Sequence, residues 1–164
     1  MKNIVLIGMP ASGKSTIGVI LAKTMGMDFV DTDLLIQKKE NKLLQDIITE
    51  KGIDSFIQIE EEIILELNCN NHVVATGGSV IYSHKAMEHL KQNGILVYLN
   101  TSYDEIKRRL TNITSRGIVF GKEQDLQGLF NERTPLYEKY ADIILDCTGK
   151  EVEEIVNLIK DKLS

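Results

Sequence analysis

The feature that most constrains this chain is the segment GMPASGKST at residues 8–16, which contains the pattern Gly-x-x-x-x-Gly-Lys-Ser. A short apolar run precedes it at residues 4–7, and an apolar helical pattern follows from Ile17. In the order strand, glycine loop, helix, this pattern predicts a loop whose backbone N–H groups surround a phosphate group. The alternative is an ordinary glycine turn that leads into a helix.

The chemistry of such a loop assigns its residues. Glycine at positions 8 and 13 keeps side chains away from the bound phosphate, and Lys14 reaches the β and γ phosphates as a point charge. Ser15 offers its hydroxyl to Mg²⁺, and the helix that starts here favours anions. The segment therefore predicts a site for a nucleoside triphosphate with magnesium. Its expected nucleotide contacts are Gly8, Pro10, Ala11, Ser12, Gly13, Lys14, Ser15 and Thr16.

Size and charge limit the class of protein. A chain of 164 residues suits one domain with a three-layer core, and we expect residues 1–164 to form it. The net charge of −5 argues against general binding of nucleic acid or of acidic membranes, and no run approaches the 18 apolar residues of a membrane span.

The cysteines and the N-terminus bear on location. Cys69 and Cys147 are far apart and outside any zinc pattern, so they indicate neither a metal site nor a disulfide framework. No cleavable apolar segment stands ahead of the first strand. We therefore expect a cytoplasmic protein, and we expect it to be a monomer.

Apolar periodicity predicts alternating strands and helices. Strands are expected at residues 4–7, 28–31, 72–75, 95–99 and 143–145. Helices are expected from residue 14 to Gly26, over 34–67 with a break at Gly52, and over 83–92 closed by Gly94, 102–110, 126–140 apart from Pro135, and 152–159. This alternation predicts an α/β fold with a five-stranded parallel sheet covered on both faces. Residues 111–123 lack a sustained period and are expected to form a mobile loop.

Asp31 and Asp33 follow the second expected strand, at the end of the sheet where ligands bind in open α/β folds. Two carboxylates there can divide the work of phosphoryl transfer. Asp31 is the candidate for the metal side, and Asp33 is the candidate that accepts the proton of a hydroxyl or orients it. The alternative is that Asp33 only caps the following helix.

Arginine is rare in this chain, which has fifteen lysines and four arginines. All four lie between residues 108 and 133, so each marks a place where a planar group that grips phosphate or carboxylate is useful. Arg116 lies on the expected loop and can close over a triphosphate, while Arg133 suits an anionic acceptor. Arg108 and Arg109 have the alternative role of neutralising a helix C-terminus.

The remaining polar candidates give weaker signals. The turn at residues 76–79, TGGS, follows a strand and has small residues that let a ligand approach the backbone, although a plain turn has the same composition. The three histidines have no metal-binding spacing, and Tyr137 and Tyr140 are expected to pack a helix.

Together these segments resemble the shikimate kinase family, small P-loop kinases that phosphorylate a ring hydroxyl of a carboxylated substrate. The resemblance covers nearly the whole chain. It rests on GMPASGKST, on DTD at 31–33, on TGGS at 76–79, on Arg116 in a lid over 111–123, and on ERTPLYEKYAD at 132–142.

The resemblance implies a fold and a set of roles. The fold would be a three-layer P-loop kinase with a mobile lid, and residues 33–67 would bind the acceptor. Asp33 would act as the base that binds the acceptor hydroxyl, and Asp31 would help hold Mg²⁺. The other roles are nucleotide contacts for Arg109 and Arg116, acceptor contacts for Gly77, Gly78 and Arg133, and proximity to adenine for residues 146–148.

Two positions depart from the family pattern. The acceptor helix usually carries Phe-Arg followed a few residues later by Glu, and this chain has Phe56-Ile57-Gln58-Ile59-Glu60, without the arginine. The third glycine of the turn is replaced by Ser79. The resemblance implies transfer of the γ-phosphoryl group of ATP to a hydroxyl of a small anionic metabolite, and shikimate is the first candidate for this acceptor. The alternatives are a different acceptor (a sugar acid, an amino-acid alcohol or a nucleoside) and a nucleotide-binding module without catalysis.

Overall fold

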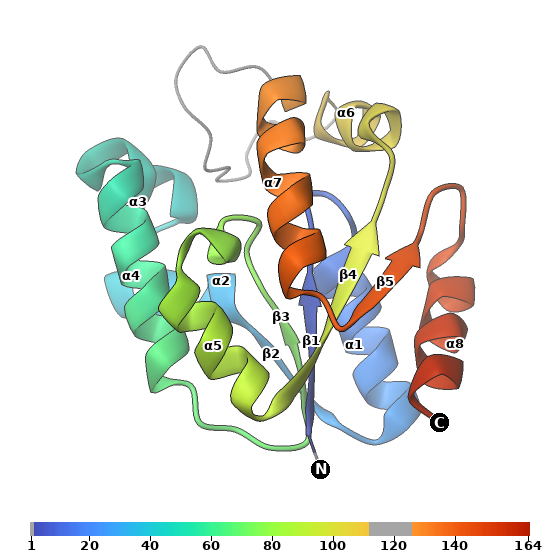
Figure 1. The fold of residues 1–164 in the computed structure, drawn as a ribbon. Coiled ribbons are helices and arrows are strands. Elements are labelled where there is room, and N and C mark those ends of the chain that lie inside the picture. Colours follow the sequence, from blue (N-terminus) through green and yellow to red (C-terminus); the bar gives the residue numbers. More distant parts are fainter. Residues whose placement is uncertain (1, 112–125) are drawn as a thin grey trace.

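The computed structural model describes residues 2–111 and 126–164, and it is built on a five-stranded sheet with the order β2-β3-β1-β4-β5 (Figure 1). All four pairs of neighbouring strands are parallel. The strands are β1 (Asn3–Ile7), β2 (Asp28–Asp31), β3 (His72–Ala75), β4 (Gly94–Asn100) and β5 (Ile143–Asp146). The predicted fold class is confirmed. The predicted lid over 111–123 lies almost entirely outside the described residues, and Arg116 lies outside them.

Helices connect the strands and cover both faces of the sheet (Figure 1). They are α1 (Lys14–Met25), α2 (Thr32–Glu40), α3 (Leu44–Lys51), α4 (Ile53–Glu66), the short 3₁₀ turn η1 (Val80–Tyr82), α5 (His84–Gln92), α6 (Tyr103–Thr111), α7 (Leu126–Tyr140) and α8 (Val152–Leu163). None of the helices in the described part of the chain is long and apolar enough to span a membrane.

The central strand β1 shows why both faces are covered. All five of its residues are buried, and successive side chains point to opposite faces of a sheet. Ile4 and Leu6 belong to the apolar cluster that includes α1 and α8, while Val5 and Ile7 belong to the cluster that includes α4, α5 and α7. A strand buried on both faces reads as a continuous apolar run, which is what residues 4–7 are.

Helices α2, α3 and α4 form a separate small cluster beside the sheet. Its buried residues are Ile36, Ile47, Phe56 and Ile63. The sequence predicts one break in this region, at Gly52, but the structure has a second break at Asn41, which ends α2 with a φ of 56°. Asparagine tolerates this left-handed conformation because its short side chain can hydrogen-bond locally, so α2 and α3 can fold back on α4.

The predicted closure of α5 by Gly94 is wrong in detail. Asn93 is the C-terminal cap of α5, and Gly94 is the first residue of β4. A Cβ atom at position 94 would lie 2.6 Å from the carbonyl oxygen of Leu90, so glycine is needed there for close packing and not for a helix-ending turn.

The strand order places the loop after β1 at a switch point. The chain leaves β1 for β2 and β3 on one side, and then crosses to β4 and β5 on the other. A crevice opens at the carboxyl ends of the strands where the direction of winding reverses. The loop at residues 8–13 therefore lies where ligands bind in this class of fold.

Candidate active site

The phosphate-binding loop joins β1 to α1 and has the backbone that its glycines allow. Gly8 and Gly13 have φ values of 152° and 92°, and Gly13 caps the N-terminus of α1. A Cβ atom on Gly8 would lie 3.0 Å from the carbonyl oxygen of Leu99. The left-handed backbone and the close approach together explain why glycine occupies these positions.

Two cationic side chains lie at this loop. Lys14 is almost fully buried, and its Nζ donates hydrogen bonds of 2.8 Å to the carbonyl oxygens of Gly8 and Met9. Arg109 reaches the loop from α6, where its Nη1 donates a 2.8 Å hydrogen bond to the carbonyl oxygen of Ala11. Arg109 therefore does more than neutralise its own helix, whereas Arg108 stays exposed beside Glu105.

Asp31 and Asp33 have different surroundings in the structure. Asp31 caps α2, because its Oδ1 accepts a 2.9 Å hydrogen bond from the backbone N–H of Asp33. Its Oδ2 accepts a 2.8 Å hydrogen bond from the Ser15 hydroxyl. Asp33 lies in the first turn of α2 and lines the pocket described below. The capping alternative for Asp33 is wrong, since Asp31 fills that role.

The glycine turn at residues 76–79 is packed against site side chains. A Cβ atom on Gly77 would lie 2.7 Å from Asp33 Oδ1, and one on Gly78 would lie 2.9 Å from an Arg133 guanidinium nitrogen. Thr76 fixes the start of the turn through a 2.7 Å hydrogen bond from its hydroxyl to the carbonyl oxygen of Leu6. A plain surface turn would not require glycine for such contacts.

Arg133 is a fully buried cation on α7. Its Nε donates a 3.2 Å hydrogen bond to the Tyr82 hydroxyl, and its guanidinium lies 5.2 Å from the centre of that ring. Tyr137, one turn further along α7, donates a 2.6 Å hydrogen bond to the carbonyl oxygen of Gly78. Burial raises the pKa of both tyrosines. Tyr137 therefore ties α7 to the glycine turn, in addition to the packing role expected of it.

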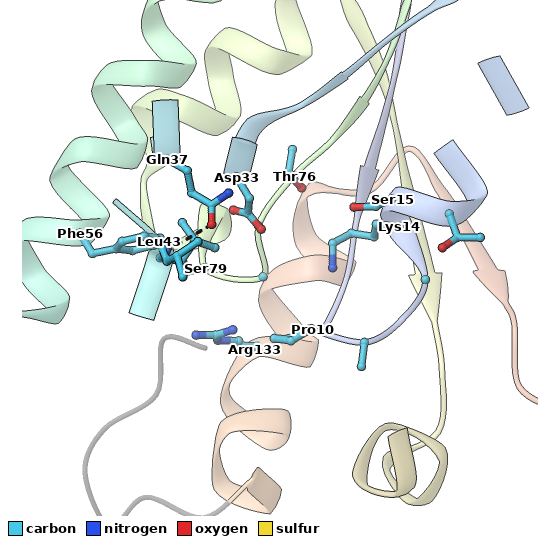
Figure 2. Close-up of a pocket in the computed structure, with 16 residues that line it drawn as sticks. Pro10, Lys14, Ser15, Asp33, Gln37, Leu43, Phe56, Thr76, Ser79 and Arg133 are labelled. Atoms are coloured by element: carbon cyan, nitrogen blue, oxygen red, sulfur yellow. Dashed lines mark hydrogen bonds between the residues drawn. The ribbon is translucent and has the colours of Figure 1, made fainter. Parts of the chain in front are cut away.

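These elements enclose one pocket with a cavity volume of about 280 Å³. Figure 2 shows Lys14 and Ser15 on one side of it and Gln37, Leu43, Phe56 and Ser79 on the other, with Asp33 between them. The lining residues are Pro10, Ala11, Gly13, Lys14, Ser15, Thr16, Asp33, Gln37, Leu43, Leu44, Phe56, Thr76, Gly77, Gly78, Ser79 and Arg133. The pocket thus brings together the loop, Asp33, the glycine turn and Arg133.

The segment over 33–67 was expected to bind the acceptor, but sequence reasoning did not single out the residues by which α2, α3 and α4 form the wall of the pocket. Leu43, Leu44 and Phe56 give this wall an apolar surface, and the Gln37 side chain accepts a 3.3 Å hydrogen bond from the backbone N–H of Leu44. These residues look like ordinary core positions in the sequence, because nothing in their spacing shows which of them will border a cavity.

Sequence reasoning assigned no role to Glu60, the glutamate that follows Phe56-Ile57 on the acceptor helix. It is 1% exposed and lies behind the glycine turn, where its Oε1 accepts a 2.8 Å hydrogen bond from the Ser79 hydroxyl. A signal was present, since Glu60 falls on the apolar face of α4 with Phe56, Ile63 and Ile64. An acidic residue on a buried helical face requires a partner and often marks a site.

The two departures from the family pattern lie in different surroundings, because Ser79 lines the pocket and Ile57 does not. Ile57 packs against the apolar cluster of α2, α3 and α4, and Gln58 lies at the surface, 3.4 Å from Glu62. Neither side chain lines the pocket. Within the described residues, Arg133 is the arginine that borders the pocket, and no group of three acidic, histidine or cysteine side chains is placed to hold a metal ion by itself.

The other predicted positions are unremarkable in chemistry. Asp146 accepts a 3.0 Å hydrogen bond from the backbone N–H of Thr148, which lowers its pKa, at the carboxyl end of β5. His84 and His89 make hydrogen bonds to Tyr140 and to the Leu67 carbonyl. Both cysteines are free thiols.

A glycine loop of this kind, facing a carboxylate across a pocket at the carboxyl ends of the strands of a parallel sheet, defines a P-loop kinase. A family model described as Shikimate kinase matches residues 10–164. The chain therefore belongs to the shikimate kinase family and is a phosphotransferase with a hydroxyl acceptor, within a family of ATP-using kinases.

Individual relatives agree with this placement. The chain is 37% identical to the shikimate kinase of Bacillus mycoides, with 100% of this chain and 99% of the relative covered. It is 39% identical to that of Thermodesulfovibrio yellowstonii, with 97% and 93% covered. The solved shikimate kinase of Acinetobacter baumannii in complex with shikimate superposes with a TM-score of 0.92, at 30% identity over 99% of this chain and 93% of that one.

Proposed function

We propose that this enzyme transfers the γ-phosphoryl group of ATP to a ring hydroxyl of shikimate and so forms shikimate 3-phosphate. The observation that carries the proposal is the shared pocket, in which the phosphate-binding loop faces Asp33 and Arg133. The relative from Acinetobacter baumannii, solved with shikimate, supports the choice of acceptor.

On the nucleotide side, we assign phosphate binding to the loop residues from Gly8 to Thr16. Lys14 balances the charge of the transferring group, and Arg109 supports the loop from outside through Ala11. Arg116 is proposed to neutralise the same charge from the lid, on the strength of the family resemblance.

Magnesium fits the oxygen atoms present. The Ser15 hydroxyl and the Asp31 carboxylate lie 2.8 Å apart, and Mg²⁺ prefers a few such oxygen ligands together with phosphate oxygens and water. When bound, Mg²⁺ would neutralise charge on the β and γ phosphates. The hydrogen bond between Ser15 and Asp31 keeps both oxygen atoms at the phosphate side of the pocket.

On the acceptor side, we propose that Asp33 orients the attacking hydroxyl and takes its proton. Gly77 and Gly78 let the acceptor ring approach the backbone, and the Arg133 guanidinium binds its carboxylate. The helical segment over residues 33–67 forms the far wall of this subsite. Catalysis would then consist of positioning and charge neutralisation.

A second candidate is a kinase for a different hydroxyl compound. The observation that favours it is the apolar wall of Leu43, Leu44 and Phe56, together with the packing of Ile57 in the helical cluster, away from the pocket. Within the described residues, Arg133 is the arginine that borders the pocket. A pocket with a single arginine also suits an acceptor that depends less on anion binding.

The test is ADP release in the presence of ATP and magnesium across a panel of acceptors. We expect ADP formation that depends on shikimate, and much less with a sugar acid, serine or a nucleoside. Faster turnover with another member of the panel would transfer the function to that acceptor class. Saturable ATP binding without acceptor-dependent ADP release would instead identify a non-catalytic nucleotide-binding module.

Replacing Arg133 with lysine is expected to raise the KM for shikimate by about tenfold to about a hundredfold, because a lysine cannot form the paired hydrogen bonds of a guanidinium with a carboxylate. The affinity for ATP should change little. Steady-state kinetics with each substrate varied in turn measures both values. Arg108→Lys, at the exposed surface of α6, is the matched control and should behave as the wild type.

We further propose that residues 1–164 act as a single domain, as a monomer in the cytoplasm. The Bacillus mycoides relative has nearly the same length, which supports one domain. Two free thiols fit a reducing compartment. Sedimentation equilibrium at working concentration would check the oligomeric state.

A further inference from the structure

The buried carboxyl group of Glu60 lies directly behind the acceptor pocket. Its Oε1 is held by Ser79, while its Oε2 has no hydrogen-bond partner among the described residues. A Cβ atom on Gly77 would lie 2.8 Å from Glu60 Oε2 and 2.7 Å from Asp33 Oδ1. Two carboxyl groups therefore meet at Gly77, one at the pocket wall and one behind it.

The charges around Glu60 oppose one another. Burial and the nearby Asp33 raise the pKa of Glu60 to about 8, while Ser79, Arg133 and Lys14 act in the opposite direction. A second negative charge beside Asp33 is unfavourable where water is excluded, so Glu60 is neutral at pH 7. At alkaline pH Glu60 becomes negatively charged, and the cations that act on it, Arg133 and Lys14, line the pocket.

The charged groups on other elements that pack on α4 do not change the balance of charges around Glu60. Helix α5 meets α4 through the hydrogen bond of 2.7 Å from Ser83 to Glu61, the next residue along. On α3, Lys51 pairs with Glu40 at the surface. The Tyr82 and Tyr137 hydroxyls beside Arg133 have pKa values raised by burial, so neither carries charge in the range of interest.

We propose, on the basis of the function proposed above, that Glu60 is a specificity-determining residue for the charge of the acceptor, with Ser79 as its positioning residue. While neutral, Glu60 adds no negative charge near Arg133, so the guanidinium attracts the carboxylate of the acceptor. Once ionised, it competes with that carboxylate for the same guanidinium. The pocket therefore favours an anionic acceptor at neutral pH and loses this preference as Glu60 ionises.

The test measures the Kd for shikimate by calorimetry, without nucleotide, from about pH 6.5 to about pH 9.5. In the wild type the Kd should rise about tenfold over this range, the size expected when a charged hydrogen-bonding partner is lost. In Ser79→Ala the rise should move to higher pH, because the Ser79 hydroxyl stabilises the ionised form of Glu60. In Glu60→Gln the Kd should stay constant.

Ser83→Ala is the matched control. It removes the neighbouring serine–glutamate hydrogen bond and a cap of α5, but Ser83 does not line the pocket. Its Kd should follow the wild-type dependence on pH, even if its melting temperature falls. A shift in this control equal to that of Ser79→Ala would overturn the proposal, since loss of stability alone would then explain both.

The ionisation of Glu60 is also measured directly, by ¹³C NMR of glutamate-labelled protein without any ligand. The Cδ resonance of Glu60 is the one that is missing from the spectrum of Glu60→Gln. It should titrate with a pKa above 7 in the wild type, and this pKa should be higher in Ser79→Ala. Titration in the ordinary carboxyl range, or a flat wild-type Kd, overturns the inference. If shikimate fails to bind at any pH, the proposed acceptor is wrong and the NMR titration alone decides the role of Ser79 and Glu60.

Discussion

Replacing Asp33 with asparagine is expected to lower kcat by about 10²-fold to 10⁴-fold, the range that a positioned proton acceptor contributes. Asparagine keeps the size of the side chain beside Gly77 but cannot take a proton from the attacking hydroxyl. The affinity for magnesium–ATP should remain within about twofold, because Asp31 and Ser15 hold the phosphate side. Steady-state kinetics and ATP calorimetry measure the two effects separately.

Asp28→Asn provides the matched control for this experiment. Asp28 is an exposed aspartate at the start of β2, at the opposite end of the strand from the pocket. It should retain wild-type turnover. Asp33→Asn with wild-type kcat would remove Asp33 from the proposed chemistry, whereas loss of ATP binding in that variant would show that its role is structural.

Replacing Glu60 with glutamine is expected to change the pH dependence of stability. In the folded protein the pKa of Glu60 is raised to about 8, against an ordinary value of 4.5, so the folded state holds one more proton than the unfolded state between these values. Unfolding then releases a proton, and the free energy of unfolding falls as pH rises. From pH 5 to pH 8 the wild type should lose at most about 4 kcal/mol that the variant keeps.

Urea unfolding at several values across this range measures the difference. The exposed Glu62→Gln, two residues further along α4, is the control and should follow the wild type. Parallel stability curves for the wild type and Glu60→Gln would show that Glu60 ionises in its ordinary range, and would also weaken the role proposed for it in acceptor binding.

Local sequence determined the framework of this protein. The apolar run at residues 4–7 predicted a strand, which is buried on both faces, and the glycines at 8 and 13 predicted a loop whose backbone suits glycine, as their φ values show. The alternation of strands and helices then predicted the parallel sheet. Site residues next to these elements, such as Lys14 and Asp33, were found because their place follows from the neighbouring strand end.

The contacts that escaped prediction join distant segments of the chain. Ser79 meets Glu60 across 19 positions, Tyr137 meets Gly78 across 59, and Arg109 meets Ala11 across 98. No local pattern encodes these pairs, because each depends on how whole helices pack on the sheet. The sequence by itself therefore determined the loop, the sheet and the reaction class. Only the tertiary structure decided which carboxyl lies buried behind the acceptor pocket, since burial and charge are properties of the packed chain.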